Sequence, residues 1–338
     1  MICDGTAKVW DWIEGGTNAL SSSLEMGRRL VSLTTTLGIA TVIAAILLLR
    51  GSNDAVATHE RPKSRMDTTV LDYNQPVLPE GTPRTRSAEE GSADLGLKPT
   101  VPTYDGSGRI WARTYLPDTR IFPEPHPAIM ILHGGGGMNG GYLEFARWWR
   151  DQGYASIVVD SFGSRGVAEN WLTYNQFGAN MRSADAVATA RYVRGLPGID
   201  VKRIYMSGGS QGGWTVLRTL TAGTPWNDEA ISLIAAGIAW YPVCDRAEPG
   251  SVPLGPFTRP VLFLQGTGDT ATPPEKCADL ASGPNVRNIV FPGATHAFDF
   301  RAPPRTHAFW EYPERYDALA TARARAEALA WTETNRSP

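Results

Sequence analysis

The chain has 338 residues, a formal charge of −2 at pH 7, and a composition that is 42% hydrophobic and 20% charged. This near-neutral balance excludes the strongly basic surface by which proteins bind nucleic acid, and its 3 cysteines are too few and too scattered for a zinc site. The apolar content suffices for a sizeable core, in one large domain or two smaller ones. We expect neither a metal nor an organic cofactor.

An apolar run near the start of the chain predicts a membrane anchor. Residues 1–29 form a tail without a clear period or an assignable function, and Arg28-Arg29 at its end is a weak twin-arginine signal. From Leu30 to Leu49 no residue is charged, and at 1.5 Å per residue this length crosses the ~30 Å hydrocarbon core of a bilayer. The alternatives are a signal peptide, cleaved after the A-x-A sequence at 55–57, and a buried helix of a soluble domain.

Residues 50–97 have the composition of a flexible linker. They are rich in Pro, Thr, Ser, Gly and charge and hold few aliphatic side chains, so the folded domain is expected over 98–338. Basic residues flank both ends of the apolar run. The charge count alone would keep the domain in the cytoplasm, but the positive-inside rule does not settle the topology. We adopt export to the periplasm or the extracellular side as a hypothesis, which protease added to intact spheroplasts would test. A cytoplasm-facing domain and secretion after cleavage are the alternatives.

From residue 98 onward, short apolar runs alternate with helical patterns, which is typical of a parallel sheet with crossover helices. Strands are predicted at 110–116, 128–132, 156–160, 203–206, 234–240, 261–265 and 287–291. Helices are predicted at 142–152, 183–194, 212–222, 274–281 and 313–331. In an open α/β fold of this kind, functional groups gather at the carboxyl ends of the strands.

The loop after the strand at 128–132 reads His-Gly-Gly-Gly-Gly. Residues without side chains let backbone N–H groups approach a reacting carbonyl, and an oxyanion hole needs two such donors. We assign one donor to Gln211, the residue after the predicted nucleophile, and the other to Gly135 or Gly136. A phosphate-binding loop and a plain flexible turn are the alternatives, but the required phosphate-loop patterns are missing. His133 is expected to hydrogen-bond this loop.

The segment from Gly208 to Gly212 has the form G-x-S-x-G and lies between an apolar strand pattern and a helical pattern. This is typical of a nucleophile elbow, in which a serine projects from a sharp strand-to-helix turn. Small residues are needed on either side because a Cβ there would obstruct the close contact of strand and helix. The context favours Ser210 as a nucleophile over a glycine-rich turn with an ordinary serine.

Two later loops supply the partners that a serine nucleophile needs. Asp269 follows the strand at 261–265, and His296 follows the strand at 287–291. An imidazole suits the role of general base, and a buried carboxylate holds it in the correct tautomer. The order Ser210, Asp269, His296 matches that of hydrolases with a nucleophile elbow. Asp299 is the alternative acid, although its place three residues after the histidine better suits a role in stabilising the loop.

Several other side chains are candidates for the substrate pocket or for structural roles. Arg165 either binds a substrate carboxylate or pins its own loop through Asp160. Cys244 and Cys277 lie just beyond adjacent predicted strands and would pair in an oxidising compartment, or stay as buried thiols in the cytosol. The aromatic candidates for the pocket walls are Trp171, Tyr174 and Trp214.

Residues from about 98 to 338 resemble the dienelactone hydrolase family of α/β-hydrolases. The motifs that carry the resemblance are HGGGG at 133–137, DSFGSRG at 160–166, GGSQGG at 208–213, YPVC at 241–244, the Asp269 loop and HAFD at 296–299. The resemblance implies an α/β-hydrolase fold, with a mostly parallel central sheet flanked by helices, and hydrolysis of a small-molecule ester. Dienelactone hydrolases proper use a cysteine nucleophile, so Ser210 favours a broader serine esterase.

We therefore expect a membrane-tethered serine hydrolase that cleaves carboxylic esters through an acyl-enzyme. A serine peptidase or an acyltransferase would use the same triad, and a non-catalytic envelope binding module is the alternative from another class. The short spacing from Asp245 to Arg259 leaves little room for a lid domain, so we expect a fairly open pocket for small or medium acyl groups. The sequence gives no indication of the oligomeric state.

Overall fold

The computed structural model describes residues 66–67, 92–167, 178–246, 251–307 and 311–337. The segment from Leu30 to Leu49 and most of the linker lie outside these residues, as do Trp171 and Tyr174, so their roles stay predictions. Among the helices that the structure describes, none is both long and apolar enough to cross a membrane.

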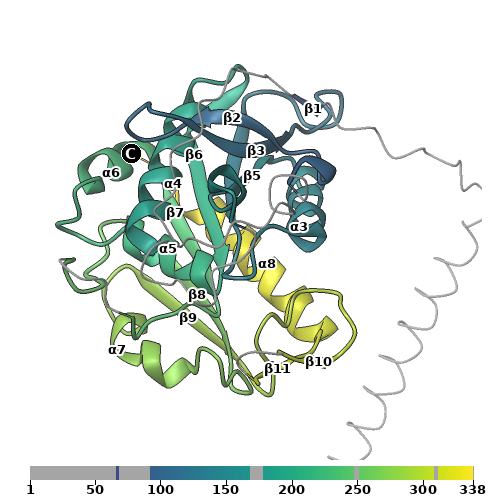
Figure 1. Cartoon of the computed structure of the whole chain (residues 1–338), viewed down its shortest axis with the longest axis vertical. Coiled ribbons are helices and arrows are strands. Elements are labelled where there is room, and N and C mark those ends of the chain that lie inside the picture. The colour runs from purple at the N-terminus through teal and green to yellow at the C-terminus, as the bar shows by residue number, and fades with distance from the viewer. Residues whose placement is uncertain (1–65, 68–91, 168–177, 247–250, 308–310, 338) are drawn as a thin grey trace, which may run out of the picture. The chain divides into compact units, whose positions relative to one another are not determined.

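A nine-stranded sheet organises the described residues (Figure 1). Its order is β1-β3-β5-β4-β6-β7-β8-β9, with β2 beside β3. The strands are β1 Met66–Asp67, β2 Lys98–Pro102, β3 Arg109–Tyr115, β4 His126–Leu132, β5 Ala155–Asp160, β6 Ile199–Gly209, β7 Ala236–Trp240, β8 Val261–Gly266 and β9 Val286–Phe291. The neighbours from β5 to β9 pair in parallel, whereas β1, β2 and β3 form antiparallel pairs.

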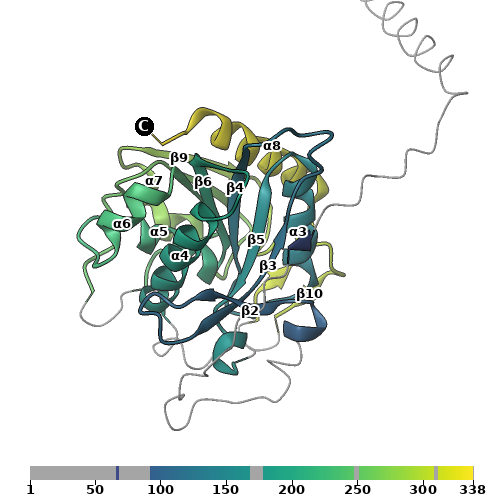
Figure 2. The same ribbon diagram turned by 90° about the horizontal axis from the view of Figure 1, so that it is seen from above.

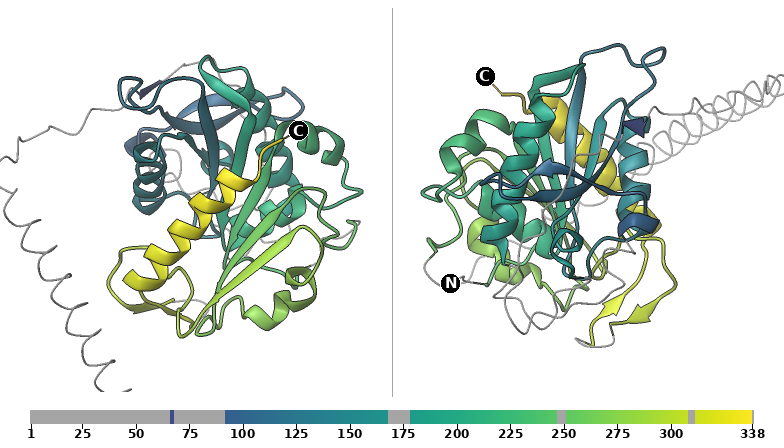
Figure 3. Two further views of the ribbon diagram at one scale, coloured as in Figure 1. Left: turned by 180° about the vertical axis from the view of Figure 1, so that it is seen from behind. Right: turned by 45° about the horizontal axis from the view of Figure 1, so that its top comes forward.

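Helices cover both faces of the sheet, as the view from above shows (Figure 2). The helical segments are α3 Gly140–Asp151, η1 Gly163–Arg165, α4 Ala179–Arg194, α5 Gln211–Thr219, α6 Asn227–Leu233, η2 Pro274–Cys277, α7 Ala278–Ala281 and α8 Ala318–Thr334. One core cluster packs α4, α5 and α6 against the sheet, and a second packs α3 and α8 against the opposite face. Seen from behind, α8 runs across that second face (Figure 3). Strands β4, β5, β7 and β8 are buried along their whole length, as parallel strands between two helix layers must be.

The seven strands predicted from the sequence are confirmed, although β6 begins four residues earlier than expected, at Ile199. The pattern missed β2 and α6. The last helix was predicted over 313–331, and this start is wrong. Pro313–Glu314 is instead a short strand, β11, paired with β10 at Arg305–Thr306. The helix begins only at Ala318 because the Asp317 side chain caps it, accepting from the N–H groups of the second and third helical residues.

A disulfide joins Cys244 to Cys277, whose Cα atoms lie 5.1 Å apart. It connects the loop after β7 to η2, which follows the loop that carries Asp269. The bond therefore encloses β8 and the acid loop in one covalent ring.

Replacing both cysteines by serine should lower the free energy of unfolding by about 3 to 4 kcal/mol. The bond spans a sequence separation of 33, and opening that ring returns conformational entropy to the unfolded chain. Urea unfolding of the double variant, compared with oxidised wild-type protein, measures the loss. Reduced wild-type protein should unfold at the midpoint of the variant, and equal midpoints for all three samples would contradict the prediction.

Candidate active site

Ser210 lies on the sharp turn between β6 and α5. Its φ is 56° and its ψ is −116°, a conformation that costs a residue with a Cβ on the order of 1–3 kcal/mol. The backbone holds the turn on both sides, since Ser210 N–H donates to Trp240 O at 2.9 Å and Ser210 O accepts from Trp214 N–H at 3.0 Å. This turn presents the serine side chain to a pocket.

The glycines around Ser210 are needed for close packing of backbone on backbone. A Cβ on Gly208 would lie against the carbonyl oxygen of Gly212, far inside van der Waals contact. A Cβ on Gly212 would strike the carbonyl oxygen of Leu132 in the same way. The start of α5 thus packs closely on the end of β6, as the sequence predicts for an elbow, and also on the end of β4, which was not predicted.

His296 and Asp269 form a buried pair in which the ring Nδ1 lies 2.8 Å from Asp269 Oδ2. The other carboxylate oxygen accepts from the N–H groups of Ala271 and Thr272, each at 2.9 Å, and the Thr272 hydroxyl lies 2.8 Å from Oδ2. Burial alone would raise the pKa of Asp269, but His296 and these hydrogen bonds outweigh it and leave that pKa below its usual value. The carboxylate is therefore ionised at neutral pH and holds the imidazole with its Nε2 available as a base.

Asp299, the alternative acid, lies elsewhere in the network. It accepts a hydrogen bond from the Tyr241 hydroxyl at 2.7 Å, and burial raises its pKa. The Tyr241 ring in turn packs edge-on against His296, with centroids 4.8 Å apart. Asp299 thus supports the wall beside the histidine, in agreement with the structural role preferred from the sequence.

The glycine loop after β4 lies beside Ser210. His133 Nδ1–H donates to Gly134 O at 2.7 Å, and burial, reinforced by Arg182, holds the pKa of His133 below its usual range. The side chain therefore braces the loop as a neutral imidazole, the role expected for it. Gly135 and Gly136 line the pocket together with Ser210. Gln211 is the first residue of α5, where backbone N–H groups point out of the helix end.

Arg182 connects the glycine loop to the start of α5. Its buried guanidinium donates to His133 O and, at 3.2 Å, to the Gln211 side chain. It also lies over the Phe162 ring, 5.0 Å from the centroid. No sequence pattern marks Arg182, because its partners come from distant segments that only the folded sheet brings together.

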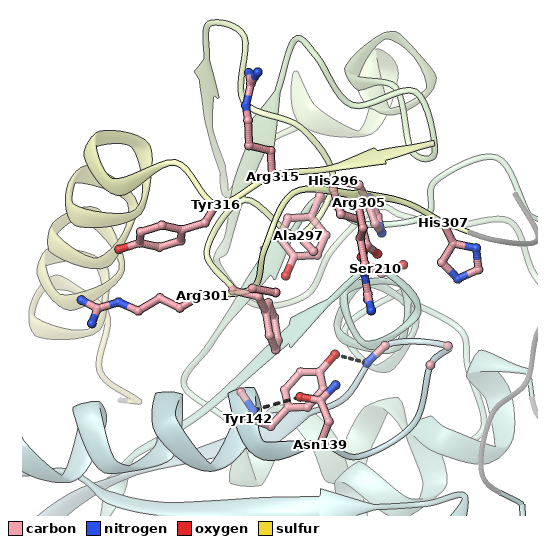
Figure 4. A pocket seen from close by; sticks show the side chains of 18 of the residues that line it. Asn139, Tyr142, Ser210, His296, Ala297, Arg301, Arg305, His307, Arg315 and Tyr316 are labelled. Atoms are coloured by element: carbon pink, nitrogen blue, oxygen red, sulfur yellow. Dashed lines mark hydrogen bonds and ion pairs between the residues drawn. The ribbon is translucent and has the colours of Figure 1, made fainter. Parts of the chain in front are cut away.

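The pocket has a volume of about 810 Å³ and an aromatic and charged lining (Figure 4). Ser210 and His296 line it near the carboxyl ends of their strands, and the late segment around β10 and β11 lies beside His296, which forms a β-bridge to Glu314 and packs edge-on against the Tyr312 ring. Its aromatic lining residues are Tyr142, Tyr241, Phe300, Tyr312 and Tyr316, and its charged ones are Glu144, Arg301, Arg305, Glu314 and Arg315. Of the late residues that line the pocket, Glu314, Arg315 and Tyr316 fall within 313–331, which was assigned to a helix, whereas those from Phe300 to Tyr312 lie in no predicted helix or strand.

Two predicted pocket residues lie elsewhere. Arg165 is not among the lining residues; it pairs with Asp185 of α4 through two hydrogen bonds of 2.9 and 3.0 Å. It does pin its own loop, but Asp160 is not the partner, since that carboxylate accepts from Ser92 at 2.6 Å and from Gly163 N–H at 2.8 Å. Trp214 is buried with Ala179 and Val243 in a small cluster, away from the lining.

No group of three or more His, Cys, Asp or Glu side chains in the described ranges is arranged to hold a metal ion. The chemical groups that meet at this pocket are a strained serine, an imidazole paired with a carboxylate, and glycine N–H groups. On a mostly parallel sheet with helices on both faces, this arrangement defines the class of α/β-hydrolases.

The chain belongs to the dienelactone hydrolase family, whose family model matches residues 110–335. No curated protein sequence matches the chain at a significant level. Among solved structures, a dienelactone hydrolase-like promiscuous phosphotriesterase from metagenomic libraries is 19% identical, with a TM-score of 0.56 over 70% of this chain and 97% of its own. Esterase 2 of Thermogutta terrifontis, phosphorylated by paraoxon, is 23% identical, with a TM-score of 0.52 over 70% and 93%. At these identities the likeness shows the fold alone.

Proposed function

We propose that this chain is a serine esterase that cleaves small carboxylic esters through an acyl-enzyme intermediate. One observation carries the proposal: a serine on a strained elbow and a buried histidine, 2.8 Å from a carboxylate, line the same pocket. Membership of the dienelactone hydrolase family supports ester hydrolysis.

Each residue has a separate role in the proposed reaction. Ser210 Oγ attacks the ester carbonyl carbon while His296 Nε2 takes its proton, and the carbonyl electron pair moves onto oxygen. The N–H groups of Gln211 and of Gly135 or Gly136 hold that oxyanion. The bond to the alcohol oxygen then breaks, and the alcohol leaves with the proton from His296. Water repeats both steps on the acyl-enzyme and releases the acid.

The pocket favours small and medium acyl groups. Its volume of about 810 Å³ falls within the roughly 300–1,000 Å³ typical of small-molecule sites. Five aromatic side chains line it, which suits an apolar acyl or alcohol group, and three arginines and two glutamates add charged groups to the lining.

Labelling with a fluorophosphonate, followed by peptide mapping, tests the nucleophile directly, and a panel of p-nitrophenyl esters tests the substrate class. We expect one label, on Ser210, and turnover that is highest for acetate to hexanoate and falls for longer chains. The same panel run with an added amine or alcohol separates hydrolysis from acyl transfer. A label on another residue, or an absence of ester turnover, would refute the proposal, and preferred cleavage of amides would make the protein a peptidase.

A further inference from the structure

Tyr142 projects from the first turn of α3 into the pocket, on the side of the glycine loop (Figure 4). Its side chain is held firmly. The hydroxyl oxygen accepts a hydrogen bond from Gly134 N–H at 2.7 Å, and the ring packs edge-on against Phe300 with centroids 4.9 Å apart. Only 9% of the residue is exposed. Its position is therefore fixed by contacts on both the ring and the oxygen.

The hydroxyl proton of Tyr142 has no acceptor among the described residues. A phenol carries one O–H donor besides its lone pairs, and the bond from Gly134 N–H uses only a lone pair. Burial raises the pKa of Tyr142 to about 12, so the phenol keeps its proton at neutral pH. A buried donor that faces a pocket without a partner in the fold is suited to a group that enters the pocket.

Tyr142 Oη and Ser210 also border the same small volume. A Cβ built on Gly134 would lie 3.1 Å from Tyr142 Oη and 3.5 Å from Ser210 Cβ. Gly134 directly precedes the two glycines that are the backbone donor candidates. The phenol is therefore on the side of the serine where the carbonyl oxygen of a bound ester has to lie.

We propose that the Tyr142 hydroxyl is a third oxyanion donor, one that acts beside the two backbone N–H groups. The inference rests on the proposed esterase function. As the bond from Ser210 Oγ to the carbonyl carbon forms and the electron pair moves onto oxygen, the phenol donates a hydrogen bond to that oxygen and keeps its proton. The bond it accepts from Gly134 polarises the O–H and strengthens it as a donor. Tyr142 is thus a catalytic residue contributed by a helix rather than by a loop motif.

Tyr142→Phe should lower kcat on p-nitrophenyl acetate by roughly 10²-fold, the usual effect of losing one oxyanion donor, and leave KM within about threefold. Tyr154→Phe is the matched control. It removes a buried phenol oxygen that contacts Thr332 and Glu333, far from the pocket lining, and should leave kcat unchanged. A Tyr142→Phe enzyme with the wild-type kcat would overturn the inference.

A second measurement separates donation to the oxyanion from a merely structural role, in which Tyr142 only accepts from Gly134. Ring fluorination makes a phenol a better donor and a poorer acceptor. Site-specific 3-fluorotyrosine at 142 should therefore raise kcat above wild type at neutral pH, whereas a bracing role predicts a fall. A fall overturns the inference even if Tyr142→Phe does not fold. Wild-type protein that takes the fluorophosphonate on Ser210 and hydrolyses esters keeps the proposed function in place whichever way the tyrosine variants behave.

Discussion

Ser210→Ala should abolish turnover of p-nitrophenyl acetate, with a fall in kcat of roughly 10⁶-fold, the scale known for loss of the serine of a hydrolytic triad. The substitution removes the attacking oxygen and no other heavy atom. Alanine meets the same backbone strain at φ 56° that serine does, so the fold should persist. Initial rates and a thermal melt on the same sample measure the two effects separately.

Ser207→Ala is the matched control, since Ser207 lies three residues earlier on β6 and is buried. Its hydroxyl accepts from Trp240 Nε1 at 3.0 Å, so the change leaves a buried donor unsatisfied at a cost of about 1–3 kcal/mol in stability. It should spare most of the activity. Ser210→Ala should therefore lose activity and keep its stability, whereas Ser207→Ala should lose stability and keep most of its activity. A Ser207 variant less active than the Ser210 variant would reject the assigned nucleophile.

Asp269→Asn should lower kcat by roughly 10⁴-fold, because an amide no longer selects the imidazole tautomer that serves as base. Shape and volume change little, so KM should stay close to wild type. The lowered pKa of Asp269 also predicts a change in stability with pH. A depressed carboxyl pKa stabilises the fold above the unfolded-state value, and this contribution is lost as the pH falls through the folded-state value. The stability gap between wild type and the variant should therefore narrow in acid.

Asp299→Asn serves as the comparison for the acid. An asparagine at 299 still offers an oxygen to the Tyr241 hydroxyl, and the carboxylate that lies 2.8 Å from His296 Nδ1 is that of Asp269. We expect kcat to fall by less than about tenfold, because Asp299 does not orient the base and its replacement leaves most of the transition-state stabilisation in place. A larger loss at 299 than at 269 would exchange the two roles.

The three residues of the proposed triad could be predicted because each one lies in the turn or loop that follows a strand. Parallel neighbours end at one edge of the sheet, so Ser210 after β6, Asp269 after β8 and His296 after β9 had to lie near one another once the sheet was recognised. The chain order then assigned the roles. The glycine loop follows β4 and lies at the same edge of the sheet for the same reason.

Side chains whose partners lie far away in sequence could not be predicted in this way. Arg165 carries a charge that suits any carboxylate, and only the packing of α4 selects Asp185 over Asp160. In the sequence, Tyr142 has the position of an apolar residue in an amphipathic helix. The sequence of α3 does not indicate that its hydroxyl accepts a hydrogen bond from Gly134 N–H. The β11 strand was missed because its residues continue into the helical pattern without a break before Asp317.

The contact between the elbow and the end of β4 sets how much the active site must rearrange. Leu132 and Gly208 are partners in the parallel register of β4 and β6, and a Cβ on Gly212 would strike the Leu132 carbonyl oxygen. The strand that leads to the nucleophile and the strand that leads to the glycine loop therefore end as one rigid unit. On the proposed mechanism, the sheet itself preorganises the backbone dipoles that would receive the developing charge, so the barrier would include little cost for turning them toward the substrate.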